Sequence, residues 1–350
     1  MTAPLVDLSA VVGDPREAPP LRWGVLGAGY IGGSFADAVT RHTSSTVLAT
    51  GSRDVSKAVK FAAEHGIDRA YGSYEELVTD PDVDAIYVAT PHSLHHDHAL
   101  LAIGAGKHVL VEKAFTRNAV EAREVIDAAR SAGVFVMEAM MTRHLPHMVA
   151  LTQIIGRGDI GELREIRAGF DVDVPFDAQH RMFDAELAGG ALLDLGIYPL
   201  SFAVDLLGSP DEVRASGLLT STGVDAQETI VLRYGQEALA TLSTSVRTSH
   251  PQTATIIGSA GRIDLAESYF VPTTFTVTTA DGAVTGYDGR LRSEDGEVYT
   301  EGKQFEAAEV ARCVAAGLTE SPRMTLDQSL ELMELMDEIR AQIGVRYPGE

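Results

Sequence analysis

Six residues near the N-terminus have the types and spacing of a phosphate-binding turn. The sequence Gly27-Ala28-Gly29-Tyr30-Ile31-Gly32 follows a short apolar run, Trp23–Leu26, and precedes a helical pattern that reaches about His42. In such a turn the first glycine permits the tight bend, the second lets the backbone approach a pyrophosphate, and the third allows close helix–strand packing. The N–H groups at the start of the helix would bind the phosphates. The strand–turn–helix context favours dinucleotide binding over a chance glycine-rich turn.

A second group of polar residues follows the next apolar run and bears on the choice of cofactor. NAD-binding units usually place an acid there to hold the ribose 2′-hydroxyl. This chain has Ser52 in that place, then Arg53, with Lys57 one helical turn further on. A guanidinium fork suits a phosphate, so the pattern predicts NADP(H), with NAD(H) the less favoured cofactor. The alternative is a solvated loop in which Asp54 is the acid that meets the ribose.

The elements around these residues alternate between strands and helices from Leu21 to about Thr142. Short β-branched runs alternate there with amphipathic stretches, which predicts a doubly wound parallel sheet, that is, an α/β Rossmann domain over residues 21–142. The strand-like runs are Trp23–Leu26, Thr46–Thr50, Ala85–Ala89, His108–Val111 and Val134–Met137. Residues 1–20 contain four prolines and Gly13, which favours a flexible N-terminal arm.

The pattern changes in residues 143–350, which predict a substrate-binding and oligomerisation domain. Helical stretches occur near 146–155 and 190–207, and two more helices close the chain from Phe305 and over Leu326–Ile343. Between them, strand-like runs follow one another across turns, so we expect an α+β domain with a large, mostly antiparallel open sheet. The runs are Leu163–Val174, Glu212–Leu219, Glu228–Tyr234, Ala238–Ser245, Thr253–Ile257 and Thr274–Thr279. An open sheet face needs covering, so we expect a homodimer or homotetramer.

Composition narrows the class of protein. The formal net charge of −22 disfavours nucleic acid and anionic membranes as partners. No apolar run approaches the roughly 20 residues of a membrane span, and the first residues lack the features of a secretory signal. Cys313 is the single cysteine, which fits a reducing compartment and a cytoplasmic location. Four nearby histidines, at 92, 95, 96 and 98, match no common zinc spacing, so we expect no metal.

Several motifs together resemble one enzyme family. Besides the glycine turn, the chain contains Thr90-Pro91-His92-Ser93-Leu94-His95, Glu112-Lys113-Ala114 and the string from Gly189 to Tyr198. Their order and spacing resemble the glucose–fructose oxidoreductase/inositol dehydrogenase (Gfo/Idh/MocA) family over essentially Leu21 to the C-terminus. Segments at 135–143 and 181–186 resemble the branch that contains trans-dihydrodiol dehydrogenase and NADP-dependent xylose dehydrogenase. The resemblance implies a small carbohydrate-like substrate.

Oxidation of an alcohol requires a hydride acceptor and a base for the hydroxyl proton. The resemblance implies that Lys113 contacts the nicotinamide ribose and the substrate hydroxyl, and that Tyr198 is the proton-transfer tyrosine. A lysine ammonium lowers the pKa of a neighbouring phenol, which would bring proton exchange closer to neutral pH. Asp194 stands four residues before Tyr198, so we expect both on one helical face. The resemblance also implies that Thr90, Pro91, His92, His95 and Glu112 lie beside the cofactor.

Two further points concern the substrate side. The family usually has Glu-Lys-Pro, often with a cis peptide before the proline, whereas this chain has Ala114. A cis bond before alanine costs roughly 2.5–4 kcal/mol, so the sequence leaves the geometry of the Lys113–Ala114 peptide open between trans and cis. Arg143, His144 and Arg181 are candidate contacts to substrate hydroxyls, with surface salt bridges the alternative for each arginine.

Two rival functions follow from the same sequence. One is a cofactor-binding sensor or regulator without catalysis, which we would expect to lack Lys113, Asp194 or Tyr198. The other is an oxidoreductase that never releases its nicotinamide and shuttles hydride between two substrates.

Overall fold

A computed structural model describes residues 5–293 and 295–350, and its contacts divide the chain into two compact units. The Rossmann unit comprises Gly13–His144 and Glu301–Met333. The sheet unit comprises Leu145–Thr300, Glu334–Glu350 and the described residues up to Val12. The division differs from the expected boundaries, because residues 301–333 belong with the Rossmann unit. Helix α8 (Lys303–Ala315) contacts α1 (Tyr30–His42), and its apolar pattern alone could not indicate which unit it covers.

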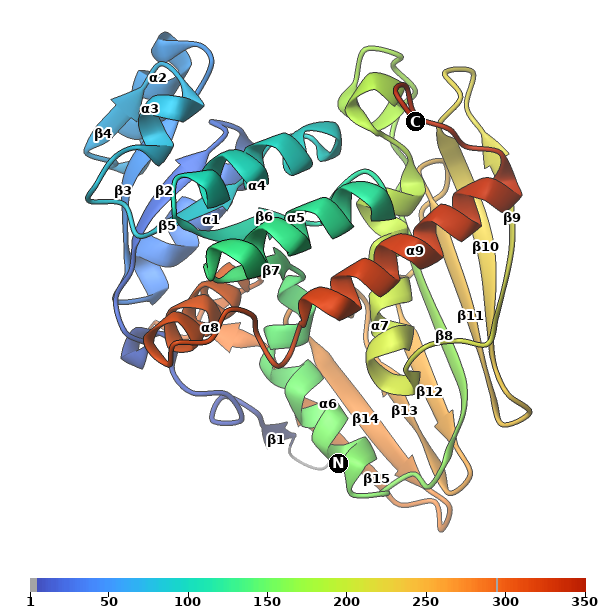
Figure 1. The fold of residues 1–350 in the computed structure, drawn as a ribbon. Helices are drawn as coiled ribbons and strands as arrows, with labels where there is room; N and C mark the ends of the chain where they lie inside the picture. Colours follow the sequence, from blue (N-terminus) through green and yellow to red (C-terminus); the bar gives the residue numbers. More distant parts are fainter. Residues whose placement is uncertain (1–4, 294) are drawn as a thin grey trace. The chain divides into compact units, whose positions relative to one another are not determined.

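The Rossmann unit is built on a six-stranded parallel sheet in the order β4-β3-β2-β5-β6-β7. These strands are β2 (Arg22–Leu26), β3 (Thr46–Gly51), β4 (Arg69–Tyr71), β5 (Ala85–Val88), β6 (His108–Glu112) and β7 (Val136–Ala139). Its other helices are α2 (Val55–His65), α3 (Tyr74–Val78), α4 (His95–Gly104) and α5 (Ala119–Ala132), visible beside the sheet in Figure 1. All four residues of β5 and all four of β7 are buried, as expected for strands covered on both faces. The predicted parallel α/β domain is confirmed.

The sheet unit is built on a nine-stranded sheet in the order β1-β15-β14-β13-β12-β8-β11-β10-β9 (Figure 1). The pairs β8–β11 and β1–β15 are parallel and the others antiparallel, so the predicted mostly antiparallel sheet is confirmed. Its strands are β1 (Val6–Asp7), β8 (Leu163–Asp171), β9 (Glu212–Leu219), β10 (Asp225–Tyr234), β11 (Ala238–Ser245), β12 (Ala254–Gly258), β13 (Gly261–Leu265), β14 (Thr274–Thr279) and β15 (Val284–Asp288). A separate two-stranded ribbon pairs β16 (Leu291–Arg292) with β17 (Val298–Tyr299).

One face of the large sheet is apolar and contacts helices, while side chains on the other face are mainly polar. On β8, Ile166 and Ala168 are buried, whereas the alternate residue Arg167 is exposed. Helix α7 (Ile197–Leu207) contacts β8 and β11, and the unit also contains α6 (Pro146–Gly156) and, from Glu334 onward, the second half of α9 (Leu326–Ile343). The stretch Ala185–Leu207 has the length and hydropathy of a membrane span, contrary to the expectation that no apolar run is long enough, yet 89% of its apolar window is buried. It is therefore read as a core element of the unit.

The N-terminal segment is more ordered than its composition suggested. Strand β1 pairs in parallel with β15, a 3-10 turn spans Pro15–Glu17, and Leu8 and Ala18 are buried. Main-chain pairing at a sheet edge leaves little trace in a sequence of prolines and small residues, which is why a flexible arm was expected. Residues 1–4 of that expected arm lie outside the described residues.

Candidate dinucleotide-binding and catalytic site

The three glycines of the turn differ in what surrounds them. Gly27 has φ +115°, and a β-carbon there would lie 2.8 Å from the carbonyl oxygen of Ala89. A β-carbon at Gly32 would lie 2.6 Å from the Gly27 oxygen, whereas one at Gly29 would meet nothing within 4 Å. Gly29 is the N-cap of α1 and makes no side-chain cap, so the first N–H groups of the helix lie beside open space. This is the arrangement that a pyrophosphate requires.

The residues after β3 are arranged around the start of α2. Ser52 is buried, its amide donates to the Tyr71 carbonyl at 3.2 Å, and its hydroxyl accepts from the Asp54 amide at 3.3 Å. Asp54 is the N-cap of α2, where its carboxylate accepts from the Ser56 amide at 2.9 Å. These hydrogen bonds hold the Asp54 pKa below its ordinary value, with the Ser56 hydroxyl the largest contributor. Asp54 thus has a structural task as a helix cap, and Arg53 and Lys57 are exposed beside it.

The loop after β5 is held by its histidines. The Thr90 hydroxyl lies 3.0 Å from His98 Nδ1, and a 3-10 turn at His92–Leu94 follows Pro91. His95 is buried, with Nε2 2.7 Å from the Thr90 oxygen and Nδ1 2.8 Å from the Ala114 oxygen. Burial lowers the pKa of His95, although two carbonyl partners favour its protonated form. His95 therefore ties the loop after β5 to the segment after β6.

The segment after β6 is fixed by buried polar side chains. The Lys113 amide donates to Glu112 Oε2 at 3.1 Å, and the Phe115 amide donates to Glu138 Oε1 at 2.9 Å. Glu138 lies on β7, and burial raises its pKa to about 7. The Lys113–Ala114 peptide, whose geometry the sequence left open, is cis.

A buried charge cluster adjoins Glu112. Lys303 Nζ, at the start of α8, lies 2.8 Å from Glu112 Oε1 and 3.8 Å from Glu306 Oε1. The Tyr87 hydroxyl, from β5, donates to Glu112 Oε1. Burial raises the pKa of Glu306 to about 8, and Glu112 adds to the rise. Sequence reasoning missed Lys303, Glu306, Tyr87 and Glu138; a glutamate within the apolar run Phe135–Met141 was the available signal for Glu138.

The candidate residues of the sheet unit lie around the start of α7. Asp194 is in a π-helical turn, Leu192–Gly196, and its carboxylate accepts from Arg181 Nη2 at 3.0 Å. Tyr198 lies in the first turn of α7, with its ring 5.2 Å from Phe170 and 5.4 Å from Phe270. A π turn therefore lies between Asp194 and Tyr198, where the sequence predicted a continuous α helix. Arg181 is half exposed and forms the ion pair that was its alternative interpretation.

The other two substrate candidates are buried in the Rossmann unit. Arg143 is 6% exposed, and its Nη1 lies 3.5 Å from the Arg323 oxygen. His144 is 3% exposed, and burial lowers its pKa to about 4, which keeps the ring neutral near pH 7. Both stay predictions as contacts to the substrate.

Within the Rossmann unit, the predicted cofactor residues meet at one edge of the sheet. Gly27, Ser52, Thr90 and Lys113 follow β2, β3, β5 and β6, and these parallel strands all end at the same edge. Ligands of doubly wound sheets bind outside that edge. A cavity of about 450 Å³ adjoins the turn and is lined by Gly29, Tyr30 and Gly33, among others. In residues 5–293 and 295–350, no group of three or more His, Cys, Asp or Glu side chains has the arrangement of a metal site.

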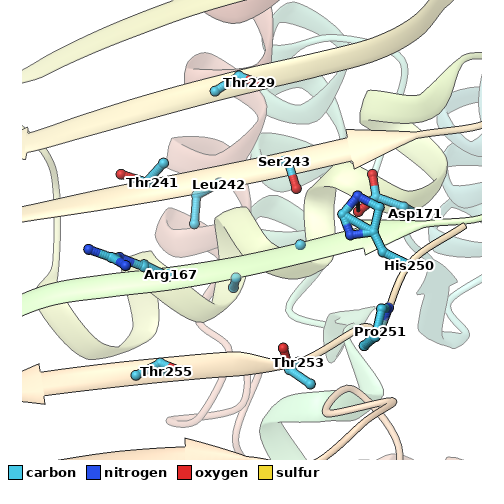
Figure 2. Close-up of a pocket in the computed structure, with 12 residues that line it drawn as sticks. Arg167, Asp171, Thr229, Thr241, Leu242, Ser243, His250, Pro251, Thr253 and Thr255 are labelled. Carbon is cyan, nitrogen blue, oxygen red and sulfur yellow. Dashed lines mark ion pairs between the residues drawn. The ribbon is translucent and has the colours of Figure 1, made fainter. Parts of the chain in front are cut away.

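A second cavity, of about 330 Å³, lies on the polar face of the nine-stranded sheet (Figure 2). Figure 2 shows Asp171 and His250 facing one another, and His250 Nε2 lies 3.8 Å from Asp171 Oδ2. Burial raises the pKa of Asp171. Thr229, Thr241, Ser243 and Thr255 line the same cavity, which contains none of the residues that the sequence singled out.

Comparison with known families matches both units. Residues 21–140 match the model of an oxidoreductase family with an NAD-binding Rossmann fold, Gfo/Idh/MocA, and residues 148–264 match the C-terminal domain of the same family. The chain belongs to the Gfo/Idh/MocA family. Among curated relatives, trans-1,2-dihydrobenzene-1,2-diol dehydrogenase of Mus musculus is 38% identical over 338 residues, covering 94% of this chain and 99% of its own. The enzyme of the same name from Danio rerio is 36% identical, with 93% and 98% covered.

Solved structures agree on the fold. An NAD binding oxidoreductase from Klebsiella pneumoniae has a TM-score of 0.80 and 26% identity, over 93% of this chain and 97% of its own. A 3-ketoreductase from Actinomadura kijaniata in complex with NADP has a TM-score of 0.75 and 27% identity, over 93% and 98%. The chain is thus an oxidoreductase of this family with a pyridine-nucleotide-binding fold.

Proposed function

We propose that this protein is an NADP(H)-dependent dehydrogenase or reductase that transfers hydride between the nicotinamide and a hydroxyl-bearing carbon of a cyclic diol, polyol or aldose. The observation that carries the substrate class is the likeness to trans-1,2-dihydrobenzene-1,2-diol dehydrogenases over nearly the full length of both chains. The open space at Gly29, beside the N-terminus of α1, supports a dinucleotide at the turn.

The choice of NADP(H) rests on the residues after β3. An acid at position 52 would repel a 2′-phosphate, whereas Ser52 carries no charge. Arg53 is exposed and can form two parallel charge-assisted hydrogen bonds to a phosphate. Asp54 would compete for the ribose in an NAD enzyme, but its carboxylate caps α2. The geometry therefore supports the phosphate-bearing cofactor.

We assign proton transfer to Tyr198 and Lys113, with Asp194 as a further catalytic-site residue. The bound nicotinamide would supply the hydride acceptor or donor. Tyr198 carries a hydroxyl that can take or return the proton of the substrate hydroxyl, and Lys113 supplies a positive charge that stabilises a phenolate. Arg181 forms an ion pair with Asp194 and keeps half of its side chain exposed, which supports its proposed contact to a substrate hydroxyl. Arg143 and His144 stay predictions for the substrate side.

Two other functions are tested by simple measurements. A sensor that has lost catalysis would bind the cofactor without turnover, although Lys113, Asp194 and Tyr198 are all present. An enzyme that keeps its nicotinamide bound would purify with the absorption of the cofactor. Neither has a specific observation in its favour.

The experiment is a screen with both cofactors. The wild-type protein and a Ser52→Asp, Arg53→Ala variant would be assayed with NADP and NAD on trans-1,2-dihydrobenzene-1,2-diol, xylose, glucose and myo-inositol. We expect kcat/KM to favour NADP in the wild type by roughly 10- to 150-fold, the value of hydrogen bonds to one charged group, and to swing toward NAD in the variant. Equal use of both cofactors by the wild type would defeat the NADP assignment.

We also propose a homodimer or homotetramer in the cytoplasm, with no nucleic-acid or membrane partner. The polar face of the nine-stranded sheet carries short side chains such as Thr229, Thr241 and Ser243, and another copy could lie flat against them. The charge of −22 supports the exclusion of polyanionic partners.

A further inference from the structure

Lys303 is a buried cation far in sequence from the predicted site. Its side chain is 11% exposed and that of Glu112 is 6% exposed, and Nζ lies 2.8 Å from Glu112 Oε1. Nζ also donates to the Tyr87 hydroxyl at 3.3 Å. Removing one member of a buried ion pair leaves an uncompensated charge, so the ionised state of Glu112 depends on Lys303.

The second oxygen of Glu112 acts on the predicted catalytic lysine. Glu112 Oε2 accepts from the Lys113 amide at 3.1 Å, where the chain leaves β6. One carboxylate therefore joins the ammonium of α8 to the backbone of Lys113. His95 and Glu138 hold the next two residues, through the Ala114 oxygen and the Phe115 amide.

We propose that Lys303 is a positioning residue for Lys113 and that it acts through the carboxylate of Glu112. The inference rests on the proposed role of Lys113. Lys303 keeps Glu112 ionised, and the ionised carboxylate is the stronger acceptor for the Lys113 amide. A protonated Glu112 would weaken that hydrogen bond and loosen the residue that carries the catalytic ammonium.

The charged groups around Glu112 indicate the direction of the effect. Burial raises the Glu112 pKa. Lys303, followed by Lys113 and Tyr87, lowers it by more than burial raises it, so the net pKa lies below its ordinary value. Glu306, also on α8, has a pKa raised to about 8, so near pH 7 its carboxyl is mainly protonated. Glu112 is then the carboxylate that forms the ion pair with Lys303. Glu138 on β7 and His95 on α4 also interact electrostatically with Glu112. Without Lys303, the effect of burial would dominate and the Glu112 pKa would rise.

The test uses the small number of lysines. The chain contains five, at 57, 60, 107, 113 and 303, so labelling with 15N-lysine gives five backbone amide signals in the full-length protein. In Lys303→Met we expect the Lys113 amide signal to move and to titrate with the raised Glu112 pKa. The acid limb of kcat/KM against pH should move upward by at least about one pH unit, since burial can shift a carboxyl pKa by several units. Lys303→Arg, which keeps the charge, should restore both readouts.

Lys107→Met is the matched control. Lys107 is half-buried in the same unit, and its ammonium donates to the Asp80 and Val83 carbonyls, both at 2.7 Å. Lys107→Met also replaces a lysine by methionine, but Lys107 makes no hydrogen bond to Glu112. The Lys113 amide signal and the pH profile of this variant should therefore stay as in the wild type.

The outcomes separate this inference from the proposed function. A Lys113 amide and a pH profile that are unchanged in folded Lys303→Met would overturn the positioning role and leave the proposed function standing. If the Lys113 amide signal moves in Lys303→Met but the wild-type protein turns over no substrate, the positioning role would be supported and the proposed function would be refuted. If Lys303→Met does not fold, Glu112→Gln removes the carboxylate through which Lys303 is proposed to act, and an unmoved Lys113 amide there would overturn the inference.

Discussion

Substitution of single glycines in the turn separates cofactor binding from folding. Gly29 and Gly27 stand two residues apart, yet their surroundings differ. A methyl group at Gly29 meets nothing within 4 Å and the backbone is extended, with φ −110° and ψ 177°. A methyl group at Gly27 meets the Ala89 oxygen at 2.8 Å, with φ +115°. Gly29→Ala should therefore leave the free energy of unfolding almost unchanged, and Gly27→Ala should lower it.

The magnitudes follow from these surroundings. For Gly29→Ala, alanine is a poorer N-cap residue than glycine, which costs about 0.5 kcal/mol of stability. Alanine also lowers the entropy of the unfolded chain, which stabilises the fold by a similar amount and offsets that cost. Its free energy of unfolding should stay within about 0.5 kcal/mol of the wild type. For Gly27→Ala, a strained backbone conformation alone costs about 1–3 kcal/mol, and the close contact with Ala89 adds to it.

Gly29→Ala should weaken cofactor binding although its stability stays close to that of the wild type. In Gly29→Ala the added methyl group occupies the open space through which a pyrophosphate would reach the backbone, so we expect the Kd for NADPH to rise about tenfold or more, equivalent to roughly 1.4 kcal/mol. Urea unfolding gives the stability and calorimetric titration gives the Kd. Wild-type NADPH affinity in Gly29→Ala would refute the assignment of this turn as the pyrophosphate site.

Three other predictions concern catalysis, pH and assembly. Tyr198→Phe should keep the wild-type Kd for NADPH and lower kcat by roughly 10²-fold or more, the range for a general acid–base group; near-normal turnover would remove Tyr198 from the mechanism. The Glu306 pKa is raised from 4.5 to about 8 in the folded protein, so Glu306 ionises first in the unfolded chain and its contribution to stability is lost as pH rises from about 4.5 toward 8. Glu306→Gln lacks this titration, so the variant should become more stable relative to the wild type across that window in urea unfolding; a constant difference would contradict a buried, neutral Glu306. Sedimentation at micromolar concentration should show a dimer or tetramer, and a single 37.3 kDa species would argue against self-association.

The sequence predicted the elements whose signals are local. The glycine turn, the parallel strands after it and the long runs of the second sheet follow from apolar periodicity and turn residues, and they occur where expected. Helix α8 was found but assigned to the other unit, because an apolar face indicates burial and not the surface that it covers. Strand β1 was missed, since its two residues are held by main-chain pairing with β15.

The site was predictable in its motifs and less so in its contacts. From its residue type, Asp54 could have been the acid that binds the ribose of NAD. In the structure its carboxylate caps α2 by accepting from the Ser56 amide, a contact that depends on the local turn. The spacing of Asp194 and Tyr198 implied one α-helical face, but a π turn lies between them. Lys303 reaches Glu112 across 191 positions of sequence. Contacts of that range depend on the tertiary fold, and a single sequence carries no signal for them.

The most direct test of the central claim follows the near-ultraviolet band of the reduced nicotinamide while the purified protein is incubated with NADP and trans-1,2-dihydrobenzene-1,2-diol, with Tyr198→Phe in parallel. We predict that the band grows with wild-type protein and grows roughly 100-fold more slowly with the variant. A protein that binds NADPH by calorimetry but produces no band with this diol, the sugars or inositol, under either cofactor, would contradict the assignment of a dehydrogenase.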